Sequence, residues 1–116
     1  MRPRYYVLIG QTPVPEGDAL KWAAWFETAD RIVKQEHVGV YFVSTVFLGV
    51  DHNWFEGPAL LFETMVFADG DSHGLHCERC AIWMEAEAQH ERIAAECRRR
   101  LVEWKSRRKT RRVRRF

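Results

Sequence analysis

This chain of 116 residues has no long hydrophobic run and few cysteines, and we expect no secretion signal. No stretch of about 18 apolar residues occurs, which excludes a membrane-spanning helix. The apolar part of the N-terminus, residues 5–9, is too short for a signal peptide. Three cysteines are few and odd in number, so we expect no disulfide framework and a reducing compartment. With 47% hydrophobic and 29% charged residues, the composition predicts one folded domain with one modest core.

Positive charge is concentrated at the C-terminal end. Residues 98–116 contain eleven lysines and arginines and a single acid, Glu103, so their net charge is +10; because the whole chain carries +2, residues 1–97 carry −8. Such a basic run stays solvated unless a polyanion neutralises it, and nucleic-acid phosphates do so with release of counterions. The other interpretation is a tail that confers solubility or folds back on the acidic body. The candidate nucleic-acid contacts are Arg107, Arg108, Lys109, Arg111, Arg112, Arg114 and Arg115.

Hydrophobic patterning predicts an α+β domain with the element order β-α-β-β-β-α. We expect strands at 5–9, 31–37, 40–48 and 60–67, and helices at 18–29 and 81–104. Short links between the last three strands favour an antiparallel sheet of three to four strands with two helices on it. Residues 1–104 would form this single domain, and residues 105–116, which lack an apolar period, would form a basic, mobile tail.

Aromatic side chains are abundant, with five tryptophans and seven phenylalanines. The helix expected at 18–29 contains Trp22 and Trp25 in an aromatic stripe too wide to face one core. Trp54 and Phe55 lie in an expected loop, where exposed aromatic residues commonly anchor a protein partner. These four residues are the candidate partner-binding residues. The alternative for the loop pair is that it folds back over the end of the sheet.

Several sequence runs resemble a family of small phage and prophage proteins. They are VSTVFLG at 43–49, DHN at 51–53, GP at 57–58, LFETMVF at 61–67 and the W-x-EAEA-x-H pattern at 83–90. The resemblance covers most of residues 5–90 and implies a phage context, hence the cytoplasm of a bacterial host, with little defined chemistry. Ile82 departs from the family, which usually has Thr there, and the basic tail is particular to this sequence.

The stretch from His73 to Cys80 is the one metal-like cluster in the sequence. Cys77 and Cys80 have a spacing that, in a tight turn, directs both thiolates at one zinc ion. His73 and His76 are the nearest candidates for the other two ligands, with His52 and Cys97 more remote. One Cys-x-x-Cys without a second pair is a weak signal, so the sequence favours incidental thiols on a polar loop and no cofactor.

The candidates for acid–base chemistry are Asp51, His52, Glu63 and His90. Asp51 and His52 precede Asn53 in an expected loop, where forming the turn through side-chain hydrogen bonds is the commoner role. Glu63 is the acid in an apolar strand, and the expected register places Thr45 opposite it. His90 lies on the apolar face of the last helix, which is typical of a core histidine, and could meet Glu63 if that helix packs on that face.

No nucleophile motif and no glycine-rich phosphate loop accompanies these residues, so the sequence favours a protein without catalytic activity. We predict a phage-type accessory protein that binds a host or phage macromolecule, with a protein partner and no membrane, and with interference in a host defence or regulatory complex as one role. The first alternative is a nucleic-acid-binding accessory protein that uses the basic tail. The second is a small enzyme or a zinc-binding protein.

Overall fold

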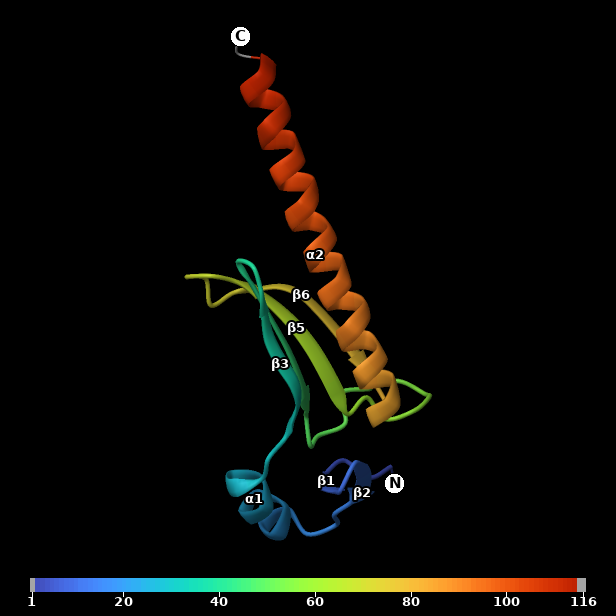
Figure 1. Ribbon diagram of the computed structural model, residues 1–116. Coiled ribbons are helices and arrows are strands. Elements are labelled where there is room, and N and C mark those ends of the chain that lie inside the picture. Colours follow the sequence, from blue (N-terminus) through green and yellow to red (C-terminus); the bar gives the residue numbers. More distant parts are fainter. Residues whose placement is uncertain (1, 115–116) are drawn as a thin grey trace.

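The chain folds into two antiparallel sheets and two helices in the order β1-β2-α1-β3-β4-β5-β6-α2 (Figure 1). The computed structural model describes the backbone of residues 2–114 and the side chains of residues 2–107. The main sheet is a four-stranded meander of β3 (Ile32–Val38), β4 (Tyr41–Phe47), β5 (Phe62–Ala68) and β6 (Gly74–Cys80). The remaining elements are the ribbon of β1 (Tyr6–Ile9) and β2 (Thr12–Pro15), then α1 (Ala19–Thr28) and α2 (Trp83–Arg114). The α+β class with two helices and an antiparallel sheet is confirmed.

α2 crosses one face of the main sheet and forms the core with it (Figure 1). Its period places apolar residues of the helix against the inward face of β4 and β5, as the sequence predicts. The side chains that meet there, each at most 4% exposed, are Val43, Phe47, Phe62, Val66, Ala86, Ile93, Ala94 and Cys97. At the end of β4, Trp25 of α1 packs edge-on against Phe47, with ring centroids 6.0 Å apart. In the part of the chain that the structure describes, no helix is long and apolar enough to cross a membrane.

The strand assignment is wrong in two places. β1 pairs with β2, for which the sequence predicts no strand, in a ribbon separate from the main sheet. β6 forms the edge of the main sheet, although most of its residues were expected in a polar loop. Its side chains are largely exposed and polar on both faces, which protects an edge strand but removes the alternation that marks a strand in sequence. The observed order therefore contains two more strands than predicted.

The register between β4 and β5 differs by one residue from the predicted one. Thr45 lies opposite Thr64, and Glu63 lies opposite Val46. A shift of one residue moves a strand's side chains to the other face of the sheet. Glu63 therefore lies on the face away from α2, where it accepts a hydrogen bond from Arg79 at 2.9 Å, and it does not meet His90.

The end of α2 is also a correction. The helix was expected to end near Trp104, where its apolar period ceases, but it continues to Arg114. Arginine and lysine have high helix propensity, so the helix does not need contact with the sheet to extend this far. The mobility of residues 105–116 stays a prediction, and Arg115 lies outside the described residues.

Candidate functional site

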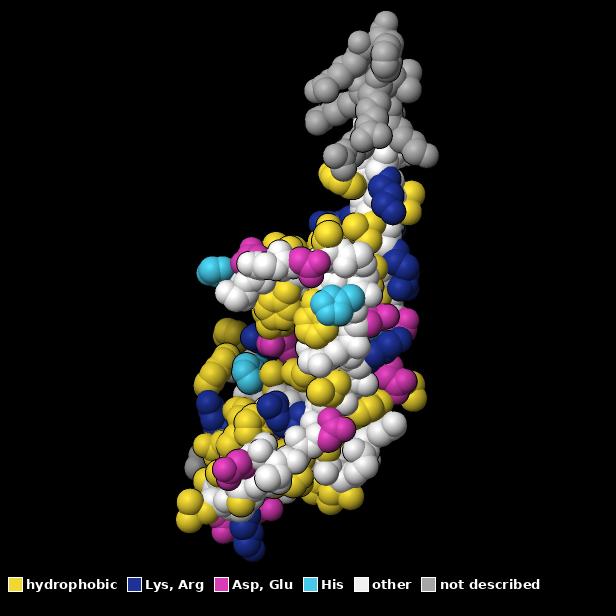
Figure 2. All heavy atoms as spheres, turned by 60° about the vertical axis from the view of Figure 1, so that its left-hand side comes forward, with side chains coloured by type: hydrophobic (Ala, Val, Ile, Leu, Met, Phe, Trp, Pro, Cys, Tyr) yellow, Lys and Arg dark blue, Asp and Glu magenta, His cyan; other side chains and the backbone are white. Residues whose placement is uncertain are grey.

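The C-terminal half of α2 projects from the body as a basic rod (Figure 1). The whole helix has 32 residues, which corresponds to about 48 Å at 1.5 Å per residue. Leu101 is the last residue packed against the core, and it approaches Gly39 in the turn between β3 and β4. Figure 2 shows lysine and arginine side chains along α2 below its grey end. From residue 98 onward, the exposed bases among the described side chains are Arg98, Arg99, Arg100, Lys105 and Arg107.

Acids within α2 neutralise only part of this charge. Glu96 is shared by Arg99 and Arg100, and the carboxylate of Glu103 lies 3.9 Å from Arg107. Of the predicted nucleic-acid contacts, Arg107 is described and exposed. The side chains of Arg108, Lys109, Arg111, Arg112 and Arg114, and all of Arg115, lie outside the described part of the chain. Beyond Arg107, the density of basic residues is therefore known from the sequence, and the structure shows that the backbone there is helical to Arg114.

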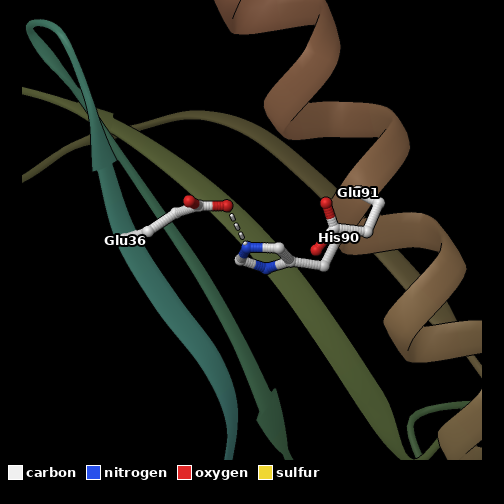
Figure 3. A group of neighbouring side chains, drawn as sticks. All are labelled: Glu36, His90 and Glu91. Carbon is white, nitrogen blue, oxygen red and sulfur yellow. Dashed lines mark hydrogen bonds and ion pairs between the residues drawn. The ribbon is translucent and has the colours of Figure 1, made fainter.

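A hydrogen-bonded network is buried between α2 and the main sheet. His90 is fully buried; its Nδ1 lies 2.7 Å from Thr45 Oγ1, and its Nε2 lies 2.9 Å from Glu36 Oε1 (Figure 3). Thr45 Oγ1 is also 2.7 Å from Thr64 Oγ1, to which Gln89 Nε2 donates at 2.9 Å. The prediction that His90 is a core histidine with satisfied hydrogen bonds is confirmed.

Gln89 fixes one end of this network, and the need to use every hydroxyl hydrogen gives the directions of the other hydrogen bonds. Its Nε2 also donates to the carbonyl oxygen of Glu78 at 3.0 Å, which fixes the orientation of the amide. Thr64 thus accepts from Gln89. The arrangement that uses both hydroxyl hydrogens has Thr64 donating to Thr45 and Thr45 donating to His90 Nδ1. His90 must then carry its proton on Nε2, from which it donates to Glu36. Every hydroxyl hydrogen is used in this arrangement, as buried polar groups require.

Glu36, His90 and Glu91 form the one group of potential metal ligands found among the described residues (Figure 3). Their ligand atoms lie within 4.8 Å of one another. The Lys34 ammonium, however, donates to Glu91 at 2.7 Å and lies 3.8 Å from Glu36. Its hydrogen bond to Glu91 raises the pKa of Lys34, and the same bond lowers the pKa of Glu91. Lys34 therefore supplies the positive charge that these carboxylates need, and we interpret the group as part of the fold.

Asp51 organises the loop between β4 and β5. It is 5% exposed; its Oδ1 accepts from the backbone N–H groups of Asn53 and Leu60 at 2.8 and 3.0 Å, and its Oδ2 accepts from Arg2 Nε at 2.7 Å. Burial alone would raise the pKa of Asp51, but the two backbone hydrogen bonds and then Arg2 outweigh it and lower the pKa. His52 Nδ1 lies 2.8 Å from the Val50 carbonyl oxygen. This loop has the turn chemistry that the sequence favoured over catalysis.

We expect Asp51→Ala to lower the free energy of unfolding by about 3 kcal/mol, because two buried N–H groups lose their acceptor. Asp51→Asn keeps an acceptor oxygen and should cost only about 1 kcal/mol. Because the pKa of Asp51 is lowered in the folded state, its contribution is complete above its unfolded pKa of about 3.9 and is lost as the pH falls further. Urea unfolding at several pH values should show a shallower acid loss for Asp51→Asn than for exposed Asp69→Asn. Equal curves would contradict this role.

The four candidate partner-binding aromatics divide into two pairs. Trp22 and Trp25 are half-buried and attach α1 to the body; Trp22 contacts Tyr5 at 4.8 Å between ring centroids and donates from Nε1 to the Tyr6 carbonyl. Trp54 and Phe55 are 69% and 83% exposed, so the alternative in which they cover the sheet is wrong. They therefore remain as the aromatic pair available to a partner.

The predicted metal ligands do not meet in one site in the described structure. Cys77 and Cys80 lie on strand β6 instead of a tight turn, and three residues along a strand place side chains on opposite faces. His73 instead contacts Asp71 at 3.0 Å, and His76 contacts Glu78 at 2.7 Å. Burial raises the pKa of Cys77 and that of Cys80, the latter to about 11, which disfavours the thiolate forms that zinc requires.

The catalytic candidates are likewise dispersed. Asp51 and His52 lie in the loop, Glu63 on the outer sheet face and His90 beneath α2. The sequence analysis did not predict Glu36, Thr64 and Gln89 as partners in this network. The pattern that could have indicated a buried polar network is one threonine in each of two apolar strands, on the face that meets His90. Thr45, Thr64 and His90 all belong to the runs that resemble the phage family.

No protein-family model matches this chain, and no curated protein and no solved structure shows significant similarity to it. The resemblance to phage proteins therefore stays a prediction from the sequence runs.

Proposed function

We propose that this protein is a nucleic-acid-binding accessory protein that attaches through the basic end of α2. The observation that carries the proposal is the continuous helix, which holds the basic segment away from the body to Arg114. A tail folded onto its own acidic body would be neutralised internally, whereas a projecting helix leaves its charge available to phosphates. On this ground we put the nucleic-acid interpretation ahead of the protein-partner interpretation. The phage context belongs to the same proposal and rests on the sequence runs.

The arrangement of charge supports contact with phosphates rather than reading of bases. Arg98, Arg99 and Arg100 are consecutive on a helix, so their side chains point in three directions around its axis. Lysine and arginine distributed around a rod neutralise phosphates without selecting a base sequence. The acidic body, at −8, would be repelled by the same phosphates and held away from the nucleic acid. Binding of this kind should show little sequence preference.

The test is a titration of duplex DNA binding against salt concentration. If α2 engages about six phosphates, the slope of log K against log salt should be about −5, from about −0.9 per phosphate. Lys105→Gln should reduce the magnitude of this slope by about 0.9. The matched control is Lys21→Gln, which removes one exposed helical lysine from α1 and should leave the slope unchanged. Equal effects of the two variants, or no duplex binding at low salt, would overturn the proposal.

A second candidate function, binding of a protein partner, is favoured by the loop that carries Trp54 and Phe55. The Arg4 guanidinium lies 4.7 Å from the centroid of the Trp54 ring, and Asn53 Nδ2 donates to the Pro58 carbonyl at 2.8 Å. The loop thus presents two exposed aromatic rings on a backbone held by hydrogen bonds, which is typical of an anchor for a partner. Because this surface is separate from the basic end, Trp54→Ala should leave duplex binding unchanged.

A further inference from the structure

A pocket of about 580 Å³ opens between α2 and the main sheet, beside the basic end of the helix. Its apolar lining includes Val66, Ile93 and Cys97, each at most 4% exposed. Tyr41 and Leu75 also line it, and Leu75 is 55% exposed. Charged or ionisable side chains make up the other half of the lining. A hollow of this size has room for a small molecule or for a single group of a larger one.

The polar groups of the pocket leave positive charge in excess. Glu78 accepts from Arg92 Nη2 at 2.6 Å and contacts His76 Nε2 at 2.7 Å, and these two bonds lower the pKa of Glu78. Glu96 serves both Arg99 and Arg100. Two carboxylates therefore face three guanidinium groups, even if His76 is neutral. This balance favours a ligand with an apolar part for the walls and an anionic part for the arginines.

The pocket is continuous with the proposed nucleic-acid interface. Arg99 and Arg100 line the pocket and also belong to the basic segment 98–116. A phosphate backbone that follows the end of α2 therefore passes the pocket mouth. A nucleotide has the two parts that the pocket requires, a flat aromatic base and an adjacent phosphate. Paired and stacked bases in a duplex cannot enter such a pocket, whereas a base of a single strand can.

Resting on the nucleic-acid function above, we propose that this pocket receives an unpaired base of a single strand whose phosphates contact the basic end of α2. The apolar part of the lining contacts the base, and Tyr41 adds an aromatic ring. Arg99 and Arg100 hold the phosphates on the base that has entered. The protein then prefers single strands over duplexes. Phosphate contacts cannot cause that preference, because a duplex has the higher charge density.

The test measures fluorescence anisotropy of the full chain with three DNAs of equal length: oligothymidine of about 12 nucleotides, a duplex, and a strand with abasic sites in place of its bases. Oligothymidine should bind at least about tenfold more tightly than the abasic strand. Leu75→Ser should weaken oligothymidine binding about fivefold and leave abasic-strand binding unchanged. Leu20→Ser, the matched change at an exposed leucine of α1, should alter neither.

The outcomes separate the two proposals. Equal affinity for the strands with and without bases would overturn the pocket proposal while leaving the phosphate interface in place. If Leu75→Ser keeps the fold and weakens both strands equally, the pocket proposal is overturned too, because Leu75 then does not act through the base. Failure of all three DNAs to bind at low salt would overturn the nucleic-acid function itself. Circular dichroism of each variant checks that the fold is retained.

Discussion

Deletion of residues 106–116 is expected to abolish duplex binding while leaving the thermal stability almost unchanged. The deletion removes seven basic residues and no acid, so the net charge falls from +2 to −5. With about six phosphate contacts at stake, the affinity should fall below detection at physiological salt. The buried core ends at Leu101, and Val102 is 66% exposed, so the free energy of unfolding should change by less than about 0.5 kcal/mol. Anisotropy and thermal melting measure the two effects.

A matched variant separates charge from helix length. Replacing the same seven bases with glutamine keeps the chain length and a good helix former while removing the charge. It should lose duplex binding as the deletion does. If the glutamine variant still binds, charge is not what holds the DNA and the proposed interface is wrong. If the deletion melts at a much lower temperature than the full chain, the end of α2 packs on the body and has a structural role.

The fold class and most of the core were predictable because the apolar pattern there is strong. In β4 both alternating sets are largely apolar, and α2 repeats Ala86, His90, Ile93 and Cys97 at helical period, so the two had to pack together. The helix expected from residue 18 begins there, because Asp18 caps α1 by accepting from the N–H groups of Leu20 and Lys21. These features depend on neighbours in sequence, which is why the sequence alone contains them.

The features that were predicted wrongly or missed depend on contacts between residues distant in sequence. The link between β4 and β5 is a long loop, so no tight turn fixes the register, and Thr45 pairs with Thr64 one residue away from the predicted partner. β6 is an edge strand whose charges hide its pattern. The pocket was not predictable because Tyr41, Leu75 and Arg99 come from three separate elements. The end of α2 was predicted wrongly for another reason: beyond Trp104 the helix depends on the helix propensity of its residues and not on an apolar face.

We also expect His90→Ala to lower the free energy of unfolding by about 3–5 kcal/mol. The ring is fully buried, so its removal leaves a cavity. It also takes the acceptor from the Thr45 hydroxyl and the donor from Glu36. Urea unfolding followed by circular dichroism measures the loss. His73→Ala is the control: its side chain is 92% exposed, so the change should be within about 0.5 kcal/mol.

A double-mutant cycle tests whether the network acts as one unit. Thr45→Val interrupts the same chain of hydrogen bonds, because Thr45 joins His90 to Thr64. Each single substitution leaves the other residue of the Thr45–His90 pair without its hydrogen-bond partner, and in the double variant both residues of the pair are gone. The two costs should therefore sum to more than the cost of the double variant, by about 1–3 kcal/mol. Strictly additive costs would mean that His90 contributes through packing alone and that the directed chain from Gln89 to Glu36 does not stabilise the fold.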